Sequence, residues 1–204
     1  QDTWYQQFAE KGWSNRAVNT NATAVGSDNY ARSPNTTALG VGNTAGGGNT
    51  TAIGVNNFAN SGSSLLAVGD GNIVAGSGSV AIGNRNNIDG TGSVAVGRSN
   101  TITGDQSNAF GQTSVVAHDR STAIGNLART TADDQIMLGN SATETVAAGD
   151  FRVVDDASIG GDLAVTGTSN LADANVSGDL TVTGDTSVQA LSATDISAST
   201  VTTT

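Results

Sequence analysis

The chain has no cysteine, one proline, one histidine and only eight aromatic residues among its 204 residues. Without cysteine it has neither a disulfide framework nor thiolate metal ligands, and one histidine cannot supply the nitrogen ligands of a zinc centre. No run of about 20 apolar residues is present, so the sequence predicts no membrane-spanning helix. What is abundant is glycine, with 27 residues, while charged residues make up only 13%. This composition is far from that of an average globular protein.

Basic residues are also scarce, because eight face 18 acidic residues and the formal net charge is −10. From Asn140 onward, nine acids face a single base, Arg152. An acidic chain in which no basic patch is visible argues against nucleic acid and anionic membranes as direct partners. We interpret the acidic surface as solvated, with calcium binding by the acidic C-terminal part as the alternative.

Groups that could converge into a catalytic site are missing as well. The only histidine, His118, has Asp119 beside it, but nothing marks a serine as its nucleophile, and we expect His118 to lie at the surface. The acids Asp70, Asp89 and Asp105 are single and scattered. We therefore predict that the protein is not an enzyme and that it needs no cofactor and no metal.

The dominant feature is a repeat marked by nine glycines. They recur every 14 residues with one step of 15, which is the signature of a stacked repeat architecture. These glycines are Gly26, Gly40, Gly54, Gly69, Gly83, Gly97, Gly111, Gly125 and Gly139.

Residue types alternate within each repeat. The residue two before the glycine is alanine in eight copies of nine, as in Ala81, and Met137 in the last. The residue just before the glycine is large and apolar in all nine copies. Because successive side chains of a strand point to opposite faces, the alanine and the large residue must lie on opposite sides of it. We call the large residues the apolar ladder; they are Val25, Leu39, Ile53, Val68, Ile82, Val96, Phe110, Ile124 and Leu138.

The second half of each repeat predicts another strand. The position five after the glycine is mostly apolar, as in Ala31, Val74 and Ile88, and an asparagine stands three after the glycine in six copies. We interpret glycine and asparagine as the corner between two strands, since both tolerate positive φ and asparagine also bonds to nearby backbone. Two strands of about five residues and two tight corners make one flat 14-residue coil. The sequence thus predicts an all-β protein containing a parallel β-solenoid.

A coil this thin has no room inside for the apolar ladder. An apolar stripe along a whole rod is larger than a soluble monomer normally exposes, so we expect it to be an interface between chains. Association would then contribute most of the stability, at roughly 1.5 to 3 kcal/mol for each fully buried side chain. A threefold axis suits such a rod, although the periodicity alone does not exclude a twofold one.

The segments Ser79–Gly83, Ser93–Gly97 and Ser121–Gly125 resemble the head repeats of trimeric autotransporter adhesins, the Yersinia-adhesin-like heads. The resemblance covers about residues 21–149. It implies a left-handed parallel β-roll, three chains side by side, and a location on the outside of a bacterium, where the protein serves attachment.

The first 20 residues differ from the repeats. Trp4, Tyr5, Phe8 and Trp13 are half of the aromatic residues of the chain. We predict that residues 1–20 form a cap over the first coil, with a short helix ending at Gly12; the alternative is a docking element. A chain that begins at Gln1 is expected for a processed secreted protein or an excised fragment.

The part from 150 to 204 has a looser repeat, in which Gly161–Gly167 returns 17 residues later as Gly178–Gly184. Its alternation predicts a strand in each copy. These segments resemble the trimeric β-shafts of bacteriophage tail fibres, so we expect residues 150–204 to form an acidic β-rich shaft or connector.

One irregularity falls within the roll. Coil four holds an inserted residue near Ser61–Ser64, and Leu65 and Leu66 replace Ser or Thr there. We predict a β-bulge at this point; the alternative is a displayed surface loop.

Several functions remain open. We favour an adhesive subunit of a homotrimeric extracellular fibre that binds a surface receptor, glycan or matrix and assembles end to end into a filament. The alternative is a receptor-binding tail fibre of a virion. Less favoured are a polysaccharide-degrading spike and an ice-binding protein that uses a flat ladder of Thr36, Thr50, Ser79, Ser93, Ser107 and Ser121.

Overall fold

The computed structural model describes residues 10–183, and its strands lie between residues 10 and 138. Most repeats contribute one strand of five residues and one of two. The strands are β1 (Glu10–Trp13), β2 (Arg16–Ala17), β3 (Thr23–Ser27), β4 (Tyr30–Ala31), β5 (Thr37–Val41), β6 (Thr44–Ala45), β7 (Thr51–Val55), β8 (Phe58–Ala59), β9 (Leu66–Asp70), β10 (Ile73–Val74), β11 (Val80–Asn84), β12 (Asn87–Ile88), β13 (Val94–Arg98), β14 (Thr101–Ile102), β15 (Asn108–Gln112), β16 (Val115–Val116), β17 (Thr122–Asn126) and β18 (Ile136–Leu138).

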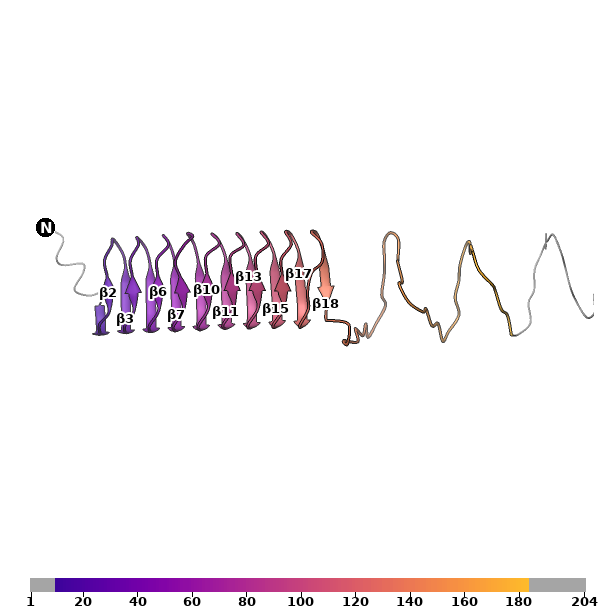
Figure 1. The fold of residues 1–204 in the computed structure, drawn as a ribbon, viewed down its shortest axis with the longest axis horizontal. Coiled ribbons are helices and arrows are strands. Elements are labelled where there is room, and N and C mark those ends of the chain that lie inside the picture. Colours follow the sequence, from indigo (N-terminus) through magenta and orange to yellow (C-terminus); the bar gives the residue numbers. More distant parts are fainter. Residues whose placement is uncertain (1–9, 184–204) are drawn as a thin grey trace, which may run out of the picture. The chain divides into compact units, whose positions relative to one another are not determined.

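The strands form two sheets that face each other across a thin core. The larger sheet has the order β1-β3-β5-β7-β9-β11-β13-β15-β17-β18, and the smaller runs from β2 to β16 through the even-numbered strands. All pairings are parallel, and the repeat glycines from Gly26 to Gly125 each pair with the next, as Gly83 does with Gly97. Figure 1 shows the resulting stack of coils from β2 to β18. The predicted parallel β-solenoid is confirmed, although its second strands have two residues instead of about five.

The stack begins one coil earlier than the repeat glycines indicated. Strand β1 pairs with β3 so that Gly12 lies opposite Gly26, and Ala17 of β2 lies opposite Ala31. The prediction of a helix ending at Gly12 is therefore wrong. The exposed edge of β3 offers these residues a full set of backbone partners, which outweighs a local helical preference. Trp4, Tyr5 and Phe8 of the predicted cap lie outside the described residues.

The core consists of two columns of small or β-branched side chains. The alanines of the first strands are fully buried, as predicted, and face a second buried column of alanine, valine and isoleucine. The second column changes from Ala in the first coils to Val and Ile in the later ones: Ala17, Ala31, Ala45, Ala59, Val74, Ile88, Ile102 and Val116. The coil interior is thus filled without the apolar ladder.

Close stacking explains why glycine recurs after the ladder position. Gly83 has φ of +125°, and a Cβ added there would lie 2.0 Å from the carbonyl oxygen of Gly97. No side chain fits within that distance of a backbone oxygen, and few residues other than glycine adopt this conformation. The same arrangement recurs along the larger sheet.

The inserted residue of coil four lies in a corner and not in a strand. Strands β7 and β9 keep a continuous register, with Thr51 opposite Leu66 and Gly54 opposite Gly69, so the predicted β-bulge is wrong. The extra residue lengthens the turn over residues 61–64, which still bonds to both neighbouring coils: the backbone nitrogen of Ser64 donates to the carbonyl oxygen of Gly48, and that of Gly78 donates to the carbonyl oxygen of Ser63. Leu65 points into the coil and is buried.

The C-terminal unit, residues 151–204, is described up to residue 183. From Ser141 to residue 183 every side chain is exposed and no strand is present. The strands predicted within 161–167 and 178–183 are thus not formed in the single chain. The physical reason is that no second segment lies alongside to accept their backbone hydrogen bonds.

Candidate association surface

The described residues bring together no cluster of metal-ligating side chains. Among residues 10–183 no group of three His, Cys, Asp or Glu side chains lies close enough to hold a metal ion, and no helix there is long and apolar enough to cross a membrane. His118 is half-buried at a return corner, and its Nδ1 lies 3.2 Å from Oγ1 of Thr130. His118 thus lies at the surface, as expected from the sequence, with its side chain partly buried.

One corner of the first seven coils is held by a buried column of asparagine, which we call the Asn ladder: Asn15, Asn29, Asn43, Asn57, Asn72, Asn86 and Asn100. The Nδ2 of Asn72 donates to Oδ1 of Asn57 and to the carbonyl oxygen of Gly83, both at 2.9 Å. Its own Oδ1 accepts from the backbone and side-chain nitrogens of Asn86 at 3.0 and 2.9 Å. Each amide therefore bonds to the coils on both sides.

The Asn ladder corrects our interpretation of the corner. Positive φ falls one residue before the asparagine, for example at Asp28, Asn56 and Arg85. The asparagines are required as buried hydrogen-bonding groups, since an unsatisfied backbone carbonyl inside the corner would be costly. At the end of the column Ser114 takes over, with its Oγ donating to the carbonyl oxygen of Gly125.

The opposite corner contains the Ser/Thr ladder that an ice-binding surface would need. All six members are fully buried, as in Ser93, whose Oγ donates to the carbonyl oxygen of Gly104 at 3.0 Å. The backbone nitrogen of Ser107 in turn donates to Oγ of Ser93 at 3.0 Å. This ladder bonds coil to coil and presents no hydroxyl face to solvent, so the ice-binding hypothesis built on it is wrong.

The apolar ladder lies on the outer face of the larger sheet. Strand pairing places Val80 beside Val94, Ile82 beside Val96, and Phe110 beside Ile124. Leu39, Ile82, Phe110, Ile124 and Leu138 are 40–49% exposed, and the other four ladder residues are partly buried by their neighbours. None is enclosed within its own coil. The single chain thus carries a continuous apolar row along this face.

Neighbouring positions widen this row. The residue two before the ladder residue points the same way and is apolar in the middle coils, as in Leu66, Val80 and Val94. The residue two after it is apolar at Val41 and Val55, which are 47% and 41% exposed. We call the ladder with these flanking residues the apolar face.

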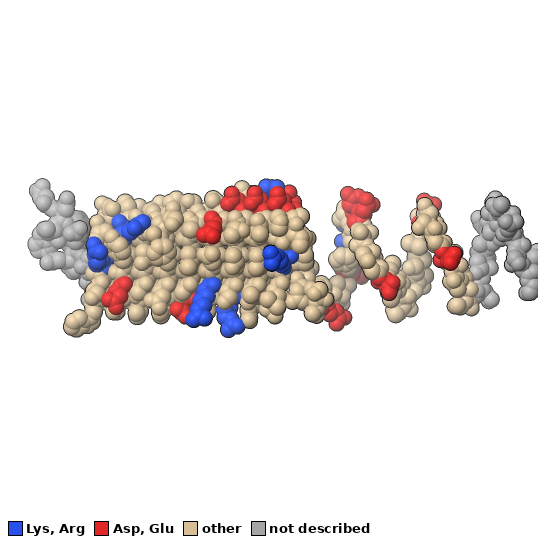
Figure 2. Space-filling view, viewed as in Figure 1, with Lys and Arg blue, Asp and Glu red and all other residues tan. Residues whose placement is uncertain are grey.

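Charged side chains gather at the corners. Figure 2 shows a row of acidic side chains along one edge of the roll over its last coils. There Asp119 Oδ1 accepts from the backbone nitrogen of Asp105, and Asp133 Oδ1 from that of Asp119. Arg120 forms an ion pair with Asp134 at 2.6 Å; this hydrogen bond lowers the pKa of the Asp134 carboxyl and raises the pKa of Arg120. These carboxylates accept hydrogen bonds along the edge and lie outside the apolar face.

Of the predicted N-terminal aromatic group, Trp13 alone falls within the described residues. It lies at the end of β1, opposite Ser27, and is 85% exposed. An exposed tryptophan at the end of a stack remains compatible with a cap or docking role, which stays a prediction.

Comparison with known families agrees with this geometry. Four segments, residues 17–43, 31–57, 66–86 and 103–128, match the family model described as YadA head domain repeat (2 copies). No curated protein matches the chain. The matched segments cover strands of both sheets and include five of the seven Asn-ladder residues and seven of the nine apolar-ladder residues. The resemblance to trimeric autotransporter adhesin heads is therefore confirmed for the roll.

Proposed function

We propose that this chain, whose roll is built from YadA head domain repeats, is an adhesive subunit of a homotrimeric extracellular fibre that attaches to surfaces. The observation that carries the proposal is the apolar face, which runs the length of the roll and is half-exposed in one chain. Soluble monomers rarely leave such a face open, whereas a symmetric oligomer buries it.

The expected gain on association is substantial. Removing the remaining exposed area of one ladder side chain from water contributes about 1 kcal/mol. Over the nine ladder residues this amounts to roughly 9 kcal/mol per chain, as an upper estimate before the cost of association. The threefold symmetry of the proposal comes from the matched family.

Attachment then falls to the surfaces that remain outside the trimer, namely the smaller sheet and the corners. Their partner is a surface receptor, a glycan or a matrix component, and the location is the cell surface. End-to-end assembly into a filament extends the same proposal. Among the described strands, β1 and β18 each pair on one side only, so the roll ends in open strand edges.

The alternative is a receptor-binding tail fibre of a virion. It is favoured by the 17-residue repeat of the C-terminal unit, whose Leu163 and Leu180 are exposed in the single chain. Electron microscopy separates the two, because a virion fibre appears as discrete tapered particles and the proposed filament as a continuous one.

The association part is tested by light scattering on the purified chain. We expect a particle of three times the 20.2 kDa chain mass, and a smaller mass for the double variant I82D/I124D. Ile73→Asp is the matched control, because Ile73 is as exposed as Ile82, 46% against 41%, but lies on the smaller sheet. A wild-type monomer, or equal effects of the ladder and control variants, would contradict the proposal.

The attachment part is tested separately. Particles coated with the trimer should adhere to cells or to extracellular matrix more strongly than particles coated with the I82D/I124D variant, because multivalent display is lost with the trimer. Equal adhesion of the two, or none by the wild type, would count against an adhesive role.

A further inference from the structure

The outer face of the smaller sheet carries a second organised surface over its first five coils. Strand pairing aligns Arg16, Tyr30, Thr44, Phe58 and Ile73 in one outward column. Later members of the same column are Asn87, Thr101, Val115 and Arg129. The two aromatic residues of the column, Tyr30 and Phe58, therefore lie in its first half, together with Arg16.

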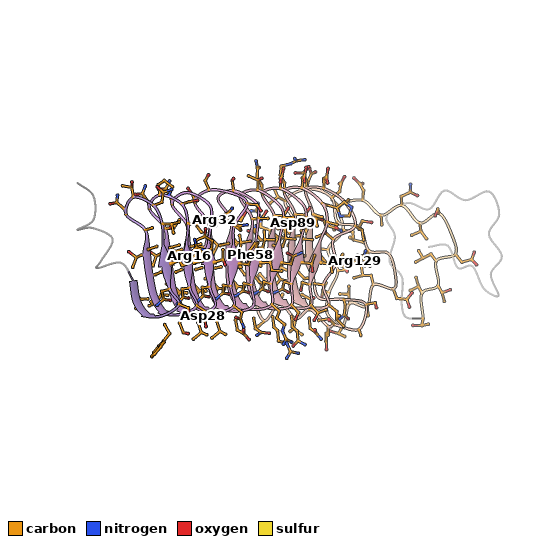
Figure 3. All side chains as sticks on the ribbon, turned by 60° about the vertical axis from the view of Figure 1, so that its left-hand side comes forward. Arg16, Asp28, Arg32, Phe58, Asp89 and Arg129 are labelled. Carbon is orange, nitrogen blue, oxygen red and sulfur yellow. The ribbon has the colours of Figure 1, made fainter. Side chains whose placement is uncertain are left out.

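Two arginines accompany the aromatic residues. The guanidinium of Arg16 lies over the ring of Tyr30, with Cζ 4.7 Å from the ring centroid. Arg32 directly follows β4. It lies next to Val18, in the outward row that neighbours the column of Arg16 and Tyr30. From strand spacing, the Cα atoms of Arg16 and Arg32 are about 8 Å apart. In Figure 3, Arg16 and Phe58 lie along one line of this face, with Arg32 beside it. We call Arg16, Tyr30, Arg32 and Phe58 the Arg–aromatic face.

Neither arginine is neutralised within the described chain. The ion pair found among residues 10–183 is Arg120–Asp134, far along the roll. Asp28 lies in a turn at the edge of the first coils, away from Arg16 and Arg32 in Figure 3, and Asp89 follows β12, several coils on. In a chain of net charge −10, this is a local patch of positive charge. The sequence did not reveal it, because Arg16 and Arg32 become neighbours only when the coils stack.

We propose that the Arg–aromatic face binds an acidic polysaccharide, that is, a linear glycan carrying carboxylate or sulfate groups. Arginine presents a planar fork of donors that matches carboxylate and sulfate oxygens. The ring of Phe58, which is 43% exposed, offers a flat apolar surface to the C–H faces of sugars, while the ring of Tyr30 holds the Arg16 guanidinium in place. A flat sheet face suits an extended chain better than a small molecule, which needs a pocket.

This inference rests on the proposed function in one respect: trimer formation through the apolar face leaves the smaller sheet outward, so one particle displays three copies of the Arg–aromatic face. Three weak sites on one rigid particle bind a long polymer with avidity. Binding to a single face does not require the trimer, so the two proposals can fail independently.

The test measures binding of the full chain to immobilised heparin, which is sulfated, to polygalacturonate, which is carboxylated, and to neutral dextran. We expect binding to at least one acidic polymer and none to dextran, with affinity falling at least tenfold between about 0.05 and 0.5 M salt because the charges are screened. The acidic polymer that binds more tightly identifies the preferred anionic group. Equal binding to dextran, or to double-stranded DNA, would overturn the proposal.

Variants locate the site. We expect R16Q/R32Q to weaken binding at least tenfold and Phe58→Ala several-fold. The matched control R85Q/R120Q removes the same charge from two corners of the roll, outside both the Arg–aromatic face and the apolar face, and it should stay within twofold of the wild type. Equal losses in both double variants would show a general charge effect and overturn the inference. Light scattering on the wild-type chain reports the trimer. A wild-type trimer that binds no acidic polymer would refute the glycan site alone, and a wild-type monomer that still binds one would refute the association alone.

Discussion

The roll and the C-terminal unit are both repetitive and rich in Gly, Thr and Val, yet of their described residues only those of the roll form strands within one chain. In the roll each 14-residue repeat closes a coil, so the next repeat finds an open strand edge at a fixed distance. In residues 151–183 the 17-residue repeat alternates in the same way, but every side chain is exposed and no strand forms. Alternation of residue types is thus insufficient for a strand to form. The chain must also turn back so that each new strand lies beside the open edge of the preceding one.

The roll and the C-terminal unit also differ in their buried polar side chains. The coils of the roll are joined at one corner by the Asn ladder and at the other by the Ser/Thr ladder, which satisfy backbone groups that the tight corners leave without strand partners. The described part of the C-terminal unit has no buried residue and hence no such column. The following predictions test this contrast, beginning with the largest effect.

Substitution of a repeat glycine should separate the two regions most clearly. Gly83→Val places side-chain atoms where the carbonyl oxygen of Gly97 lies, so we expect a loss of about 3 to 5 kcal/mol in the free energy of unfolding of the roll. Gly161→Val is the matched control, because a Cβ there meets nothing within 4 Å, and it should leave the unfolding curve unchanged. Urea unfolding followed by circular dichroism measures both. Equal curves for the two variants would refute the stacking argument.

The Asn ladder gives the next largest effect. Asn72→Ala removes the donor to Gly83 and the acceptor for Asn86, leaving buried groups without partners, and should cost about 2 to 3 kcal/mol. Asn175→Ala changes an exposed asparagine of the C-terminal unit and should cost less than about 0.5 kcal/mol. Thermal unfolding compares them. If Asn72→Ala left the free energy of unfolding unchanged, water would be replacing the side-chain amide without loss of stability.

Hydrogen exchange tests whether the C-terminal unit gains structure from association. If its strands pair between chains, amides of residues 161–167 should be protected in the wild-type particle and exchange freely in I82D/I124D. Roll amides such as that of Gly97 should stay protected in both, since they bond within the chain. Free exchange of residues 161–167 in the wild type would contradict the expected β-rich shaft.

Much of this fold could be predicted from the sequence, because a 14-residue period fixes which residues stack. Ala81 inward and Ile82 outward follow from alternation alone. The coil at Gly12 was missed because Glu10 and Lys11 stand where later copies carry alanine and the apolar ladder residue, and only strand pairing reveals it. The role of Asn72 and the proximity of Arg16 to Arg32 depend on contacts between coils, which local patterns do not encode.

The smallest effect concerns the exposed ion pair at the edge. The hydrogen bond from Arg120 lowers the pKa of Asp134, so the ion pair stabilises the folded state above the ordinary pKa of aspartate. This contribution should disappear as the pH falls through the lowered pKa. NMR titration of the Asp134 carboxyl should show the shift in the wild type and its loss in R120Q. An identical titration in both would show that Arg120 does not stabilise the Asp134 carboxylate.

The location of the apolar face between chains can be measured directly, because the chain has no cysteine of its own. A nitroxide spin label is attached to I82C on the apolar face or, in a separate sample, to I73C on the smaller sheet. We predict dipolar broadening of the spectrum for I82C, which should disappear on dilution with unlabelled chain, and a narrower spectrum for I73C. A narrow spectrum for I82C, or broadening confined to I73C, would contradict the claim that the apolar face joins the chains.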